Sequence, residues 1–172
     1  MSKKKKNNLA EATSSISING NVTLKFVCGD KVIKKKQINN TATKRLFHGI
    51  ALYLIKTPSD DYTPTFMGVG SNNQRLSSDE TLNRASLLSE YIGRRVILTK
   101  HLAQPVSNGY TVPFSAVFPS NLIGSENPIG EFGLFSTLSS DSLLARVSLG
   151  ELEYIPAGLS LIVEWNINIA NQ

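Results

Sequence analysis

The sequence predicts a mainly β protein, an antiparallel β-sandwich of the jelly-roll or immunoglobulin-like kind with one or two short helices. In the C-terminal stretch 158–169, apolar and polar side chains alternate and include the only Trp. Alternation places the two sets on opposite faces of a strand, so one face is buried and needs a second apolar layer to cover it. The same alternation at 110–118, with Gly, Asn and Pro between such runs, is typical of antiparallel sandwiches.

The first 14 residues differ in composition from the rest of the chain. They are polar, show no periodicity and contain a run of four lysines: Lys3, Lys4, Lys5 and Lys6. We expect a flexible basic N-terminal arm over residues 1–14, followed by a single β-sandwich domain over residues 15–172. The arm fits either a solvated leader or a docking segment for an acidic surface or nucleic acid.

The stretch 16–38 predicts consecutive strands. Apolar residues occupy the even positions up to Cys28, which we therefore expect to be buried, and Asn19-Gly20 favours a tight hairpin turn. After a turn at Gly29-Asp30, the next run is basic. Its lysines are Lys34, Lys35 and Lys36. Such a run fits a nucleic-acid stripe or an edge strand protected against edge-to-edge pairing, and we favour the edge strand.

The apolar period becomes that of an amphipathic helix after Thr41 and continues to Leu54. Thr41 or Thr43 would be its N-cap. Pro58 prevents any continuation, because proline lacks the amide proton that a helix interior needs. The sequence therefore predicts one amphipathic helix here.

Two shorter elements follow. Residues 66–71 predict a buried strand, and close backbone packing explains its Gly-x-Gly better than a phosphate loop does, because the loop's Lys and following helix are missing. Residues 77–82 have the composition of a helix start. Glu90 can pair with Arg94 or Arg95 across Gly93, and we expect such a pair to lie at the surface and to contribute about 0–1 kcal/mol.

The rest of the chain reads as strands separated by turn residues. They are predicted at 96–99, 110–118, 129–135, 143–149 and 158–169. The Asn108-Gly109 dipeptide marks one turn and the Gly- and Pro-containing stretch 119–128 another.

Charge and reactive residues exclude several classes of function. The net charge is +5, but without the seven lysines named above only 11 of the 18 basic residues remain, against 13 acidic ones, so the basic charge is local. Cys28 is the only Cys, so no internal disulfide forms, and no metal-ligand or nucleophile–base pattern is present. We expect no enzymatic activity, no cofactor, no membrane span and no secretory signal.

Seven motifs follow one another over about residues 40–170. They are Asn-Thr-x-Thr at 40–43, Met-Gly-Val-Gly at 67–70, Asp-Glu-Thr-Leu at 79–82, Phe-x-Ala-x-Phe at 114–118, Glu-Phe-Gly-Leu-Phe at 131–135, Leu-Leu-Ala-Arg at 143–146 and Leu-x-Val-x-Trp-x-Ile-x-Ile at 161–169. This order resembles small structural proteins of tailed-bacteriophage virions, of the tail-accessory, ring or head-fibre kind. The chain departs from their pattern at Asn83-Arg84, where a Glu is usual.

The resemblance implies a structural virion protein that is made in the host cytoplasm, forms homo-oligomers and contacts portal, tail or capsid proteins. The Lys-, Asn- and Ile-rich composition suits a crAss-like phage. Lys3 to Lys6 would be the docking arm and Lys34 to Lys36 a secondary basic edge. The alternative is a nucleic-acid or carbohydrate binding module, for which Phe26 beside Lys25 is the local hint and an exposed Trp or Tyr platform the discriminating feature.

Overall fold

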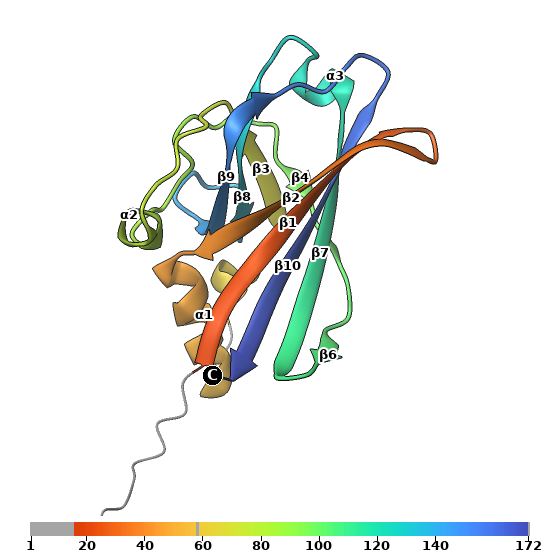
Figure 1. The fold of residues 1–172 in the computed structure, drawn as a ribbon. Coiled ribbons are helices and arrows are strands. Elements are labelled where there is room, and N and C mark those ends of the chain that lie inside the picture. Colours follow the sequence, from red (N-terminus) through yellow and green to blue (C-terminus); the bar gives the residue numbers. More distant parts are fainter. Residues whose placement is uncertain (1–15, 58, 172) are drawn as a thin grey trace, which may run out of the picture.

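Two antiparallel β-sheets form a sandwich in the computed structural model, which describes residues 16–57 and 59–171 (Figure 1). The first sheet contains β2 (Lys31–Ala42), β1 (Ile16–Cys28), β10 (Ser160–Asn171) and β7 (Gly109–Pro119), with β5 (Thr99–Lys100) and β6 (Gln104–Val106) both pairing with β7. The second contains β4 (Val96–Ile97), β3 (Phe66–Gly70), β8 (Ile129–Phe135) and β9 (Leu143–Glu153). The predicted fold class is confirmed.

The two sheets are joined at two corners. β2 runs along the first sheet and then pairs with β9 of the second through its last two residues, Thr41 and Ala42. At the other corner the stretch 96–99, predicted as one strand, is divided: β4 pairs with β3, and β5 pairs with β7. Leu98 lies between them, buried, with its amide donating to the Thr65 carbonyl at 2.9 Å. The chain therefore changes sheets at Leu98, as strands do at the corners of sandwiches.

In the part of the chain that the structure describes, four short helical segments connect the strands. They are α1 (Lys44–Leu54), η1 (Asp60–Tyr62), α2 (Ser78–Leu82) and α3 (Ser120–Ile123). Thr43 is the N-cap residue of α1, but its hydroxyl donates to the Leu143 and Leu144 carbonyls and does not cap the helix. Among the helices of the described ranges, none combines the length and apolar character needed to cross a membrane.

The C-terminal strand occupies the middle of the first sheet, between β1 and β7 (Figure 1). The side chains of its apolar parity from Leu161 to Ile167 are buried, and Trp165 is wholly inaccessible to solvent. The core is completed across the sandwich: the rings of Phe118 on β7 and Phe132 on β8 lie 5.8 Å apart. The alternation read from the sequence therefore identifies the buried face correctly.

The hairpin turn expected at Asn19-Gly20 is wrong, because β1 continues unbroken through these residues. Gly20 lies opposite Asn40 of β2 and Ile167 of β10. A Cβ atom at Gly20 would collide with the Asn40 side chain and the Asn166 carbonyl oxygen. Close approach of three strands, rather than a turn, thus accounts for this glycine.

Cys28 is exposed, contrary to the expectation of a buried thiol. The pairing of β1 with β10 ends at Val27, so no third strand covers the tip of the β1–β2 hairpin. The register with β2 also shifts between Phe26 and Val27, where β2 has one extra residue, Ile33, without a partner in β1.

Gly70 of β3 lies where a neighbouring backbone approaches closely, as predicted, whereas the near neighbours of Gly68 are the side chains of Phe135 and Glu90. A Cβ at Gly70 would lie 2.5 Å from the Ser89 carbonyl oxygen and 2.7 Å from Oε1 of Glu131. We expect Gly70→Ala to lower the free energy of unfolding by about 1–3 kcal/mol through overpacking, as measured by urea denaturation. Gly29→Asn is the control: nothing lies within 4 Å of a Cβ there, and Asn tolerates its φ of 57°. Equal losses for both variants would contradict the packing explanation.

Candidate functional site

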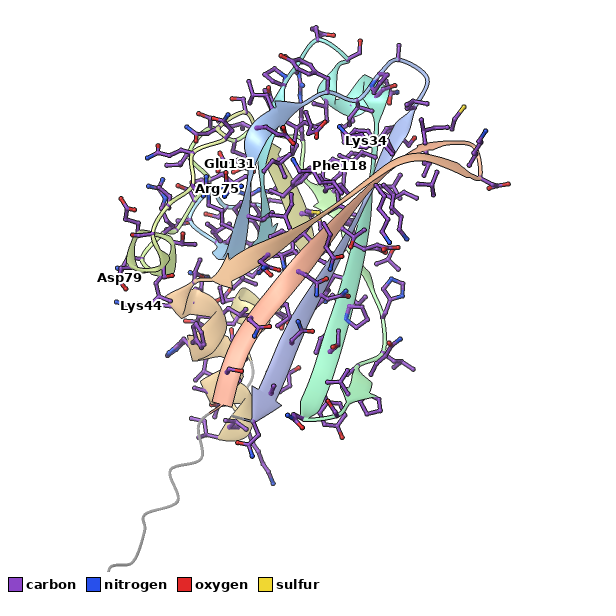
Figure 2. The ribbon with its side chains drawn as sticks, viewed as in Figure 1. Lys34, Lys44, Arg75, Asp79, Phe118 and Glu131 are labelled. Carbon is purple, nitrogen blue, oxygen red and sulfur yellow. The ribbon has the colours of Figure 1, made fainter. Side chains whose placement is uncertain are left out.

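A buried ion pair organises the long connection between β3 and β4. Glu131 of β8 is fully buried, and Nε of Arg146 on β9 donates to its Oε2 at 2.7 Å (Figure 2 labels Glu131). Its carboxylate also accepts the backbone amides of Ser89 at 2.7 Å and Leu88 at 3.2 Å. Arg146 donates in turn to the Gln74 carbonyl at 3.0 Å. Two motif residues that are 15 positions apart thus hold the connection against the second sheet.

A second ion pair holds the end of this connection. Nε and Nη2 of Arg95 donate to the two carboxylate oxygens of Glu90 at 2.6 and 2.9 Å. Nη1 of Arg95 donates to the carbonyls of Thr137 and Ser139, and the guanidinium lies 3.5 Å from the Phe135 ring centroid. The side chain of Arg95 is only 5% exposed, so the expectation of a surface pair is wrong. The loop between β8 and β9 folds over this pair and removes it from solvent.

Beside the Glu90–Arg95 pair lies an apolar groove of about 730 Å³, which we name the edge groove. Its lining includes Phe66, Glu90, Ile92, Arg95, Ile97 and Leu138. Three of its large aliphatic side chains are turned to solvent: Ile92 is 93% exposed, Ile97 75% and Leu138 69%. They come from the 90–95 turn, from β4 and from the β8–β9 loop, which the Arg95 contacts tie together. The edge groove is therefore an apolar surface whose lining segments are held together by the hydrogen bonds of Arg95.

Sequence reasoning missed the edge groove, although two signals for it exist. Leu138 stands alone in the hydroxyl-rich run 136–142, and Ile92 stands in a turn next to Gly93 and two arginines. A large aliphatic residue in a polar turn belongs to no alternating pattern, so nothing in the local sequence buries it. Only the fold shows that Ile97 lies beside Ile92 and Leu138 in the same groove.

The hairpin lysines mainly contact the protein's own acidic residues. Lys34 donates to both carboxylate oxygens of Glu153 at 2.9 and 2.7 Å, and Lys36 donates to Glu151 at 2.5 Å (Figure 2 labels Lys34). The hydrogen bond and the charge of Lys36 hold the pKa of Glu151 below its usual value. Within the described residues, β2 pairs with β9 by backbone only at Thr41 and Ala42. These ion pairs therefore link the two strands where backbone pairing is absent.

Lys3, Lys4, Lys5 and Lys6 lie outside the described residues. Lys35 is exposed at the hairpin. Phe26, the local hint for a nucleic-acid module, is buried, and so is Trp165, which leaves no Trp platform for a sugar among the described residues.

The sequence contains three pairs of neighbouring acidic residues: Asp60 with Asp61, Asp79 with Glu80, and Glu151 with Glu153. Asp60 and Asp61 are exposed, and Glu80 is used by the N-terminus of α2. There the Ser77 amide and hydroxyl donate to the Glu80 carboxylate, which lowers the pKa of Glu80. Glu153 is buried beside Lys34, whereas Glu151 is exposed. Within residues 16–57 and 59–171, no three His, Cys, Asp or Glu side chains are grouped so that they could hold a metal ion.

No family model, curated protein or solved structure compared with this chain matches it. The motifs of the sequence and the surfaces of the fold are therefore the observations that bear on function.

Proposed function

We propose that this chain is a non-enzymatic structural component of a tailed-bacteriophage virion, a tail, ring or capsid-decorating protein that acts through symmetric protein–protein assembly. The observation that carries the assembly role is the edge groove, where Ile92, Ile97 and Leu138 are all exposed around one cavity. The motif order over residues 40–170 supports the virion setting.

Exposed aliphatic side chains gathered at one place are unfavourable in water unless a partner covers them. Isolated apolar residues are normal on a surface, whereas contiguous apolar patches mark interaction sites. Complete burial of a Leu or Ile side chain stabilises a complex by about 1.5–3 kcal/mol. Because Arg95 ties together the elements that present Ile92 and Leu138, little ordering is required when a partner binds.

The edge groove suits a symmetric contact between copies of the chain. β4 is the outer strand of the second sheet in the strand order, and Ile97 is one of its two residues. In a twofold interface the same patch is used by both subunits, so every apolar side chain of the patch contributes twice. The N-terminal arm with Lys3 to Lys6 supplies a second, electrostatic contact to the portal, tail or capsid proteins of the particle.

The solution mass of the purified protein tests this proposal. By light scattering at low and at high salt, we expect a discrete oligomer that persists at high salt, because screening weakens charge contacts and leaves apolar ones intact. We expect the double variant Ile92→Ser/Ile97→Ser to weaken assembly at least about a hundredfold, since 1.4 kcal/mol corresponds to a tenfold change in Kd.

Leu102→Ser is the matched control for this experiment. Leu102 is 89% exposed and lies outside the edge groove, between β5 and β6. The control should keep the oligomeric mass, and all variants should keep the circular-dichroism spectrum of the parent protein, whereas the melting temperature of the dissociated variant falls because assembly no longer stabilises the folded state. A wild-type monomer at every concentration, or dissociation caused by Leu102→Ser alone, would contradict assembly through this groove.

A further inference from the structure

A second surface, distinct from the edge groove, gathers positive charge at the start of α1. It is a pocket of about 450 Å³ between α1, η1 and the residues that follow α2, and we name it the basic pocket. Its lining includes Lys44, Arg45, His48, Tyr62, Arg84 and Asp141. Figure 2 shows Lys44 at the outer surface on the side of the molecule that carries α2. The pocket has the size of small-ligand sites, which occupy about 300–1,000 Å³.

Contacts within the chain orient some of these cationic side chains. Nε and Nη2 of Arg45 donate to the Asp61 carbonyl at 3.3 and 3.1 Å, and its guanidinium lies 5.1 Å from the ring centroid of Tyr62. The ring of His48 lies 4.9 Å from the same Tyr62 ring. Nε of Arg84 donates to the Ser86 carbonyl at 3.3 Å, which leaves the remaining guanidinium protons of Arg84 for another acceptor.

The positive charge of the pocket is only partly balanced by the protein's own acids: the charge of Arg84 acts on the carboxylate of Glu80, whose pKa it helps to lower, but Glu80 is not among the lining residues. Among the described residues, no salt bridge engages Lys44, Arg45 or Arg84. Asp141 is the one carboxylate in the lining; it accepts the Ser139 hydroxyl, and this bond, together with the charge of Arg45, lowers the pKa of Asp141. Within the lining, the three positive charges of Lys44, Arg45 and Arg84 therefore face the one negative charge of Asp141.

The direction of α1 adds to this imbalance. The N-terminus of a helix carries partial positive charge and favours acidic side chains in its first turn. The first turn of α1 contains none, and it begins with Lys44 and Arg45. Thr43 does not cap it, since its hydroxyl donates to Leu143 and Leu144. The partial positive charge at the start of α1 therefore adds to the charges of the cationic side chains that line the pocket.

We propose that the basic pocket binds a phosphate-bearing ligand. Arg84 and Arg45 supply guanidinium donors, which match the geometry of phosphate oxygens, and Lys44 supplies a compact charge. The phosphate comes either from a free polyphosphate compound or from the backbone of a nucleic-acid strand. This site is independent of the edge groove and of the proposed assembly role.

Titration of the full-length, ¹⁵N-labelled protein with inorganic pyrophosphate tests the proposal. We expect saturable chemical-shift changes that are largest at the backbone amides of Lys44 and Arg45. The variant Lys44→Gln/Arg84→Gln should weaken pyrophosphate binding by at least about tenfold, because a hydrogen bond to a charged group contributes more than the 1.4 kcal/mol of one tenfold step. The matched control Lys31→Gln/Lys35→Gln removes the same charge from the exposed hairpin and should change binding less than about twofold.

Oligothymidine, titrated in parallel, identifies the source of the phosphate. Tighter binding than pyrophosphate, with a steep loss of affinity as salt increases, would assign the pocket to a nucleic-acid strand. Binding of pyrophosphate alone would assign it to a free polyphosphate compound. Absence of binding by both probes, shift changes away from Lys44 and Arg45, or equal weakening by the two double variants would overturn the proposal. The chemical-shift changes of the wild-type protein test the proposal even if the Lys44→Gln/Arg84→Gln variant does not fold.

Discussion

Replacement of Glu131 by Ala is expected to lower the free energy of unfolding by about 3–5 kcal/mol, because it leaves the Arg146 guanidinium buried without its partner. The substitution also removes the acceptor of the Leu88 and Ser89 amides. Chemical denaturation would measure the loss. Hydrogen exchange should show faster exchange first at Leu88 and Ser89, since the connection that leads to the edge groove loses its attachment there.

Two further variants separate charge from packing at this pair. Glu131→Gln keeps an acceptor for the backbone amides but removes the negative charge, so we expect an intermediate loss. In Glu131→Leu/Arg146→Met both charges are replaced by apolar groups, and the double variant should be more stable than Glu131→Ala, because no charge remains buried alone. If the double variant is the less stable of the two, the buried unpaired charge is not the cause of the loss.

Trp165→Ala is expected to cost about 3–5 kcal/mol, as large-to-small substitutions of buried aromatic residues do. Trp165 is wholly buried in the middle of the first sheet, with Val22 of β1 and Phe114 of β7 as its cross-strand neighbours. Its removal would therefore leave a cavity at the contact of three strands. The measurement is the midpoint of denaturation with an unchanged m-value.

Trp165→Phe distinguishes packing from hydrogen bonding at this position. The indole Nε1 of Trp165 is buried without a hydrogen-bond partner among the described residues. Loss of the indole N–H therefore removes no hydrogen bond, and we expect Trp165→Phe to cost less than Trp165→Ala because more apolar volume remains. A Phe variant as unstable as the Ala variant would show that ring size alone does not explain the contribution of Trp165.

The sequence predicts the individual elements well where the signal lies within one element. The alternation at 158–169 identifies the buried face of β10, and the helix-start composition of residues 77–82 predicts α2, whose first turn contains a capping box between Ser77 and Glu80. The prediction fails at Asn19-Gly20 and at Cys28. At both positions the outcome depends on residues of other strands. Asn40 and Asn166 lie close to Gly20, and β10 pairs with β1 only as far as Val27, so Cys28 is not covered.

Much less of the candidate sites could be predicted. Ile92 and Leu138 have a weak local signal as aliphatic residues in polar turns, but their meeting with Ile97 depends on how the 90–95 turn and the β8–β9 loop fold together. The basic pocket likewise joins Arg45 of α1 to Arg84 after α2. The hairpin lysines show the reverse case: their charge is evident in the sequence, but their acidic partners are not.

By itself, the sequence determined the sandwich class, the buried parity of the strands and the start of α2, because these depend on residues a few positions apart. The tertiary structure alone decided the strand order, the exchange of sheets at Leu98 and the partners of the charged residues. Glu131 meets Arg146 across two strands, and Lys34 meets Glu153 from 119 positions away. Such contacts depend on strand register, and a shift of one residue turns every side chain of a strand to the other face, so short-range patterns do not specify them.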